Sequence, residues 1–147
     1  MMVILDTDHL NIIQRRSEPA FIHLAARFDA VAPEDVFTTI ISFEEQMRGW
    51  LAVVQSARSL SQQVAVYQRL HRLIDFFAHA RVLAFDERAA SRYEELRRAR
   101  IRIGTMDLRI AAIALTNNAL LLSRNLSDFR KVPGLRVEDW TSPKKSG

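Results

Sequence analysis

Short apolar runs separated by long amphipathic stretches constrain the fold of this chain more than any other feature. Runs typical of strands cover residues 2–5, 36–42, 81–85 and 119–123, with a candidate fifth strand at residues 135–137. In the first, second and fourth runs, apolar residues follow one another instead of alternating with polar ones, which is typical of parallel strands covered on both faces. The pattern therefore predicts a parallel sheet with helices on each side.

Helical spacing of apolar residues fills the intervals between these runs. Helices are predicted to begin near Glu45, to cover residues 60–77, and to start after Asp86 and after Gly104. The alternation predicts an α/β fold: a three-layer α/β/α sandwich with a small central parallel sheet. The two central helices are expected to form a helical hairpin insertion.

The composition fits one folded domain and excludes several kinds of functional site. Of the 147 residues, 48% are hydrophobic and 26% charged, so we expect one domain over residues 1–142 and a flexible tail over residues 143–147. Cysteine is absent, which excludes disulfides, thiolate zinc sites and iron–sulfur clusters. The four glycines lie too far apart for a P-loop or a dinucleotide fingerprint. A net charge of +4 is compatible with a polyanionic partner without requiring one.

Neither end of the chain nor its interior carries a membrane or export signal. The longest uncharged run, residues 110–123, is shorter than the roughly 20 apolar residues of a membrane span. The apolar residues 2–5 meet Asp6 at once, so a signal peptide is not expected. We therefore expect a cytoplasmic protein with no membrane partner.

Acidic side chains follow the predicted strands. Asp6 ends the first strand, Glu44 and Glu45 follow the second, Asp107 opens the helix after Gly104, and Asp128 lies shortly after the fourth. Ligands of parallel sheets bind beyond the carboxyl ends of the strands, so these carboxylates are predicted to share one edge. Clustered carboxylates repel one another unless a divalent cation compensates their charge, and hard oxygen ligands favour Mg²⁺ or Mn²⁺. Such an ion suits phosphodiester hydrolysis by an activated water.

Each carboxylate also has a purely structural interpretation. Asp6 could cap the helix that follows it, and Asp107 could interact with the dipole of the helix it opens. Glu45 and Asp128 could be solvated residues of a helix and a loop. The metal hypothesis therefore rests on their joint placement.

Four ordered segments resemble the successive motifs of PIN domains, specifically of the VapC toxin family. They read LDTD at residues 5–8, ISFEEQMRG at 41–49, IGTMDLRIAA at 103–112 and SRNLSDFRKVPGL at 123–135, followed by EDW at 138–140. The resemblance spans nearly the whole chain. It implies a Mg²⁺- or Mn²⁺-dependent endoribonuclease, the toxin of a bacterial type II toxin–antitoxin pair, usually a homodimer neutralised by a VapB-like antitoxin.

The resemblance also assigns the residues of the site. Asp6 and Asp107 match the best-defined metal-binding acids of the family, and Glu45 matches its motif glutamate because it stands four residues before Gly49. These three are expected to be catalytic and to bind the metal.

The fourth acidic position departs from the pattern of many PIN domains. It is occupied by Asn125, and the nearest carboxylate is Asp128, which is expected to assist as a fourth catalytic and metal-binding residue. Ser123 matches the family's hydroxyl position. Ser123, Arg124 and Asn125 are expected to contact the substrate.

The remaining charged and aromatic residues carry weaker signals. Arginines near Gly104 and around the fourth motif could contact phosphates or form a solvated surface. The four histidines share no metal-ligand spacing, so structural or surface roles are expected. Trp50 and Trp140 are expected to pack in the core or a dimer seam, for which the central hairpin is a candidate.

Two other functions fit part of the pattern. A haloacid-dehalogenase-like phosphohydrolase would use Asp6 as nucleophile and Asp8 as general acid, but it needs a later lysine, and none precedes Lys131. A catalytically idle PIN module would use the acids and arginines only to recognise RNA or an antitoxin. Loss of the fourth acid is compatible with that second alternative.

Overall fold

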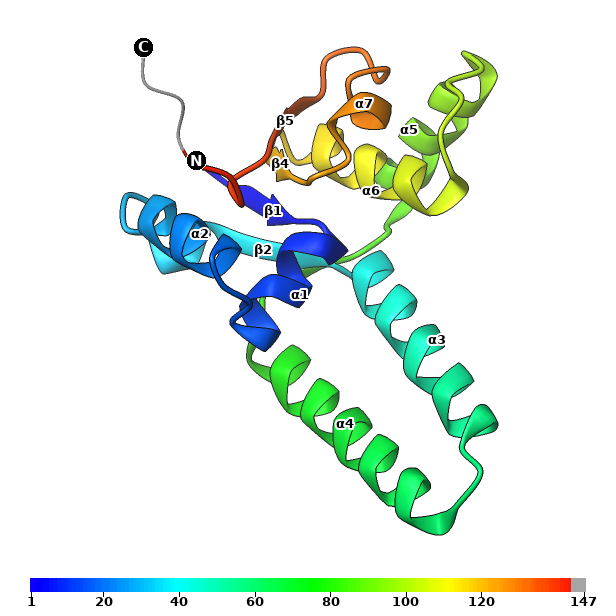
Figure 1. Cartoon of the computed structure of the whole chain (residues 1–147). Helices are drawn as coiled ribbons and strands as arrows, with labels where there is room; N and C mark the ends of the chain where they lie inside the picture. The colour runs from blue at the N-terminus through cyan, green and yellow to red at the C-terminus, as the bar shows by residue number, and fades with distance from the viewer. Residues whose placement is uncertain (144–147) are drawn as a thin grey trace.

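Five parallel strands form the centre of the molecule in the order β3-β2-β1-β4-β5. The computed structural model describes residues 1–143 (Figure 1). The strands are β1 (Val3–Leu5), β2 (Val36–Thr39), β3 (Val82–Leu83), β4 (Leu120–Leu122) and β5 (Arg136–Glu138). The α/β fold with a small parallel sheet is thus confirmed, including its candidate fifth strand.

Helices connect the strands and cover both faces of the sheet (Figure 1). They are α1 (Thr7–Arg15), α2 (Ala20–Phe28), the 3₁₀ turn η1 (Pro33–Asp35), α3 (Ile40–Ser56), α4 (Leu60–His79), α5 (Glu87–Arg98), α6 (Thr105–Thr116) and α7 (Leu126–Phe129). The predicted hairpin is formed by α3 and α4, which project from the body as a long arm (Figure 1). No helix within the described part of the chain is long and apolar enough to cross a membrane.

The continuous apolar runs are explained by two cores, one on each face of the sheet. In β1, Val3 and Leu5 pack against α1 and α2, whereas Ile4 faces the core under α5 and α6. The same alternation places Leu121 in that second core and Leu122 in the first. Every residue of these strands is therefore buried, as parallel strands between two helical layers require.

The structure corrects some predicted boundaries. The second apolar run is not a strand as far as residue 42, because the Thr39 hydroxyl accepts a hydrogen bond from the Ser42 N–H and α3 begins at Ile40. The helix α2 is absent from the sequence-based prediction. Asp86 caps α5 as expected, through the Ala89 N–H. Apart from Pro143, the predicted tail lies outside the described residues.

The strand order fixes where a ligand can bind. Successive strands run outward from β1 through β2 to β3, and the chain then returns to place β4 on the other side of β1. The reversal creates a crevice beyond the carboxyl ends of β1 and β4, the usual ligand site in open parallel sheets. The residues that follow these two strands, Asp6 and Ser123, lie at that point.

Candidate active site

Asp6 is the most deeply buried carboxylate at this edge. Its side chain is only 6% exposed. The Thr7 backbone N–H donates to its Oδ1 (2.7 Å), and the Ser123 hydroxyl donates to its Oδ2 (2.7 Å). Asp6 therefore caps α1, which is its purely structural role. It also lies in the crevice where the metal hypothesis requires a ligand.

The environment of Asp6 disfavours its charged form. Burial raises its pKa to about 7, and the charges of Asp8 and Asp107 act in the same direction. The two hydrogen bonds to Asp6 oppose the shift without cancelling it. A neighbouring cation would relieve this cost.

Asp8 differs from Asp6 because the protein satisfies its charge. Its Oδ1 lies 2.6 Å from His9 Nδ1, and its Oδ2 accepts the Arg124 backbone N–H (2.9 Å) and, more weakly, the Ser123 hydroxyl (3.3 Å). Burial alone would raise the pKa of Asp8, but the hydrogen bonds from His9 and Arg124 outweigh it and lower the pKa. Asp8 thus holds the loop after β4 beside β1.

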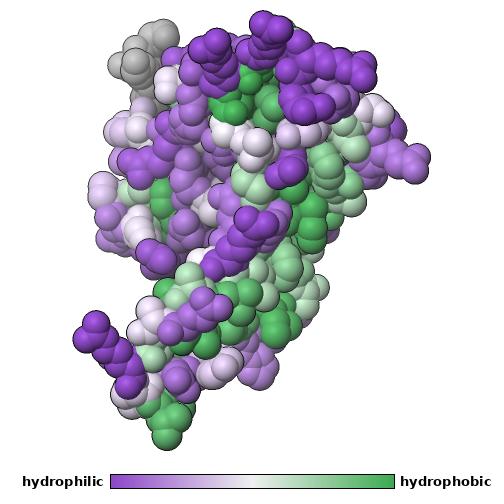
Figure 2. All heavy atoms as spheres, turned by 90° about the vertical axis from the view of Figure 1, so that its right-hand side faces the viewer, coloured by the Kyte–Doolittle hydropathy of each residue, from purple (hydrophilic) through white to green (hydrophobic). Residues whose placement is uncertain are grey.

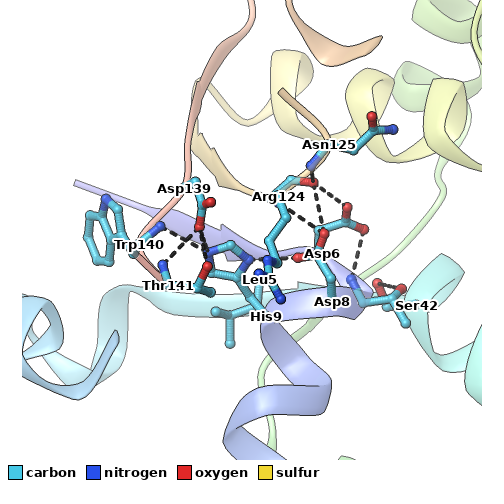
Figure 3. Close-up of polar contacts among 12 residues, drawn as sticks. Leu5, Asp6, Asp8, His9, Ser42, Arg124, Asn125, Asp139, Trp140 and Thr141 are labelled. Carbon is cyan, nitrogen blue, oxygen red and sulfur yellow. Dashed lines mark hydrogen bonds and ion pairs between the residues drawn. The ribbon is translucent and has the colours of Figure 1, made fainter. Parts of the chain in front are cut away.

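His9 connects Asp8 to the C-terminal segment and is completely buried (Figure 3). The Trp140 backbone N–H donates to His9 Nε2 (3.1 Å), so this nitrogen must carry a lone pair. The ring proton then sits on Nδ1 and is donated to Asp8. The structural role expected for His9 is therefore confirmed, and it lies directly behind the candidate site.

Glu45 approaches the crevice from α3 and is half-buried. Its Oε1 is a buried oxygen without a hydrogen-bond partner among residues 1–143. Burial raises the pKa of Glu45, the nearby Thr7 hydroxyl opposes this shift without cancelling it, and the charges of Asp107 and Glu44 add to it. An unpartnered buried carboxylate oxygen is costly, and a cation is one way to satisfy it.

Asp107 enters from the first turn of α6 and is linked to Asn125. The Asn125 side-chain Nδ2 donates to Asp107 Oδ2 (3.2 Å) and to Asp128 Oδ2 (3.1 Å), so this amide bridges the two carboxylates. Burial raises the pKa of Asp107, and the charge of Asp128 adds to it. Asn125 thus supplies a donor where many PIN domains have a fourth acid.

Asp128 lies further out than the other acids. Lys131 Nζ is 3.2 Å from its Oδ1, and the hydrogen bond from Asn125 together with this lysine lowers the pKa of Asp128. Its negative charge is therefore already compensated within the protein. A metal-binding role for Asp128 stays a prediction.

The structure thus brings together most of the residues that the sequence singled out. Asp6, Glu45 and Asp107 come from three parts of the chain, and the charge of Asp107 raises the pKa of both Asp6 and Glu45. Within residues 1–143, however, no three acidic or histidine side chains are arranged to hold an ion as they stand. Their chemistry fits a hard divalent cation, and binding one requires these side chains to reorient.

The bond of Asp8 to His9 is not predictable from the sequence, and the two tryptophans lie in different surroundings. Trp140 is buried against Phe28, with the Arg27 guanidinium 4.8 Å from its ring centroid, as expected for a core residue. Trp50 instead lines an open cavity between helices. The bond between Asp8 and His9 depends on the position that the fold gives to the buried imidazole.

Comparisons with known proteins agree with this architecture. The family model described as "PIN domain" matches residues 3–135. The plasmid stability protein StbB of Pseudomonas syringae pv. tomato is 33% identical over 92% of this chain and 96% of its own length. The tRNA(fMet)-specific endonuclease VapC of Salmonella typhimurium is 33% identical over 44% of this chain and 52% of its own. DNA-bound VapBC from Salmonella typhimurium contains a chain that is 26% identical, with a TM-score of 0.72, covering 95% of this chain and 98% of that one.

Proposed function

Because this chain belongs to the PIN-domain family and is a ribonuclease of the VapC toxin kind, we propose that it cleaves RNA with a divalent metal ion held by Asp6, Glu45 and Asp107. The ion is proposed to be Mg²⁺ or Mn²⁺, since every candidate ligand is a carboxylate oxygen and the chain has no cysteine. When bound, such an ion supplies Lewis-acid activation of the phosphodiester and of an attacking water.

One observation carries this proposal: three carboxylates, Asp6 buried and Glu45 and Asp107 half-buried, lie at one edge of the sheet without enough positive charge to satisfy them. Burial raises the pKa of Asp6 to about 7 and raises that of Glu45, whose Oε1 has no partner among the described residues. Such an arrangement destabilises the protein, and proteins tolerate it mainly where function needs it. The neighbouring Asp8, whose charge is satisfied, shows that the fold can stabilise a carboxylate here when no ligand is needed.

The residues around the carboxylates are proposed to position them and the substrate. Ser123 orients Asp6 through its hydroxyl, and Asn125 holds Asp107 through its amide. The exposed Arg124 guanidinium is proposed to contact a phosphate of the RNA. We assign Asp128 the role of fixing Asn125, with metal binding as a second proposed role to test.

The haloacid-dehalogenase alternative is not favoured. It requires Asp8 to act as a general acid, which needs a proton at neutral pH. Hydrogen bonds from His9 and Arg124 instead outweigh burial and lower the pKa of Asp8, so that it stays ionised. The late lysine of that mechanism would be Lys131, and this residue pairs with Asp128 on the surface.

We further propose that a VapB-like antitoxin and a second copy of the chain are its protein partners. We also propose that it meets its RNA substrate in the cytoplasm. Solved VapBC complexes have the same fold. Apolar side chains are exposed along the α3–α4 arm, where Figure 2 shows hydrophobic surface, and partner proteins commonly cover such surfaces. The most exposed of them are Leu60, Val64, Tyr67 and Ile74.

The test is RNA cleavage by the purified protein with Mg²⁺ or Mn²⁺ and with EDTA. Asp6→Asn and Asp107→Asn should each abolish metal-dependent cleavage, whereas Asp29→Asn, which removes an exposed carboxylate at the end of α2, should not. Cleavage that survives both site substitutions would reject the assignment. Growth arrest on expression, relieved by co-expression of an adjacent small gene, would separate a toxin from a housekeeping nuclease.

A further inference from the structure

A second concave site lies between α1, α3 and α4, away from the carboxylates. It is a cavity of about 220 Å³ that contains three arginines and no acidic residue in its lining. Its polar walls and the indole are formed by Asn11, Gln14, Arg15, Trp50, Arg69 and Arg72, and Leu73 and Phe76 complete the lining. Neither the resemblance to PIN domains nor the proposed metal chemistry uses these residues.

The charge of this cavity is uncompensated. Among residues 1–143, Arg15, Arg69 and Arg72 form no ion pair, although other surface arginines of the chain do. The guanidinium of Arg69 lies 5.9 Å from the ring centroid of Trp50. Three guanidinium groups facing one cavity repel one another, and an anion removes that repulsion while forming directed hydrogen bonds.

Hydrogen bonds to Gln46 hold two residues of the cavity wall in place. Gln46 is buried next to Glu45 in α3, and its amide bonds with Asn11 (2.9 Å) and with Gln14 (2.7 and 3.1 Å) of α1. These amides hold α1 against the arm. Because Asn11 and Gln14 also line the cavity, it offers amide groups as well as positive charge to a ligand.

A second hollow on α1 lies between this cavity and Asp8, at the border of the candidate active site. It is lined by Asp8, Asn11, Arg15 and Arg124, among others. Asn11 and Arg15 therefore belong to both hollows. At 1.5 Å per residue, the helix from Asp8 to Arg15 spans about 10 Å, a distance that a short stretch of single-stranded RNA can cross.

We propose that this arginine cavity binds a nucleotide of the RNA substrate that flanks the cleaved bond, with its phosphate on Arg69 and Arg72 and its base on Trp50. The inference rests on the proposed ribonuclease function and adds where the rest of the strand lies. Single-stranded RNA combines regularly spaced phosphates with flat bases, and an arginine pocket with one accessible indole matches both. An acidic protein segment would also pair with the arginines, but it would have no reason to extend towards the carboxylate site.

Binding measurements in EDTA test the inference without cleavage. Fluorescence anisotropy with a labelled, unstructured oligoribonucleotide, repeated over a range of salt concentrations, gives both the affinity and its salt dependence. Arg69→Ala and Arg72→Ala should each weaken binding severalfold and reduce the slope of log K against log salt by about 0.7, the value for one lost phosphate contact to a single strand. Arg58→Ala is the matched control, because Arg58 is exposed in the turn between α3 and α4, outside the cavity.

Trp50 supplies a second, independent readout. Trp50→Leu should weaken binding by about tenfold with an unchanged salt slope, because it removes a stacking surface and no charge. Trp50→Phe should retain most of the affinity. Thermal melts of all variants, followed by circular dichroism, show that each one is folded.

Parallel assays keep this inference separate from the proposed function. If the wild-type protein cleaves RNA with Mg²⁺ or Mn²⁺ but the Arg69 and Arg72 variants bind like Arg58→Ala, the cavity is not an RNA site, and the ribonuclease function stands. If a polyglutamate peptide depends on Arg69 and Arg72 while RNA does not, the cavity is a protein-binding site and the inference is wrong. A wild-type protein that neither binds nor cleaves RNA contradicts the proposed function itself.

Discussion

Replacing the buried Asp6 with asparagine should stabilise the protein while removing its activity. The pKa of Asp6 is about 7 in the folded chain, against an ordinary value of 3.8. The folded state therefore binds this proton more tightly than the unfolded state does. The stability linked to Asp6 is fully present below pH 3.8 and is lost as the pH rises to about 7.

The size of the effect follows from the same two values. At 1.36 kcal/mol per pKa unit, ionised Asp6 lowers the free energy of unfolding by about 4 kcal/mol at about pH 8. At about pH 5, more than half of this is recovered in the wild-type protein. The amide that replaces the carboxyl group cannot ionise, so Asp6→Asn should raise the melting temperature at about pH 8 by on the order of 10 °C.

Urea unfolding and thermal melts of both proteins, in EDTA at about pH 5 and about pH 8, measure this difference. Mg²⁺ should stabilise the wild-type protein at the higher pH, by about 2.7 kcal/mol at a hundredfold excess over its dissociation constant, and should stabilise Asp6→Asn less. Asp29→Asn should change the stability by no more than about 0.5 kcal/mol. An Asp6→Asn protein that is no more stable than wild type at about pH 8 would refute the view that Asp6 is held in an uncompensated site.

Three other substitutions probe the surroundings of the carboxylates. His9→Phe leaves the Trp140 N–H and Asp8 Oδ1 without partners, so the free energy of unfolding, measured with urea, should fall by about 1–3 kcal/mol for each of these two groups. An unchanged free energy of unfolding would mean that water replaces the imidazole. Asn125→Asp replaces the hydrogen-bond donor between Asp107 and Asp128 with a third negative charge, which should lower the free energy of unfolding in EDTA by about 1 kcal/mol or more. The same substitution should lower the Mn²⁺ concentration that half-saturates cleavage. A higher half-saturating concentration would contradict metal binding at this position. Phe129→Ala empties a fully buried position under α7 and should cost about 3–5 kcal/mol, measured by thermal melts against the exposed control Arg130→Ala.

The central sheet was predictable because its strands are buried on both faces. Every residue of Val3–Leu5 and Leu120–Leu122 is apolar for that reason. The boundary of β2 was not predictable in the same way. The apolar residues continue through Ile41, and only the bond from Ser42 to the Thr39 hydroxyl shows that the backbone has become helical.

The candidate site was predictable in its residues but not in their environments. The end of β1 places Asp6 at the edge of the sheet where ligands bind, and the N-terminus of α6, the helix before β4, brings Asp107 to the same edge. The Asp128–Lys131 pair is local, since the two residues are three positions apart on one helical turn, and the sequence could have revealed it. The bond from Trp140 to His9 could not be foreseen, because it joins residues 131 positions apart and its donor is a backbone N–H, which carries no sequence signal.

The contrast between two neighbouring carboxylates indicates which ones need an external cation. Asp8 is paired with a buried imidazole and with the Arg124 backbone N–H, and together these lower its pKa despite burial. Asp6, two residues away, has donors on both oxygens and still has a raised pKa, while Glu45 has an oxygen with no partner in the described chain. The fold thus neutralises the acid that positions the β4 loop and leaves unsatisfied those that face the crevice. If the acids served only to cap helices, Asp6 should be as well satisfied as Asp8.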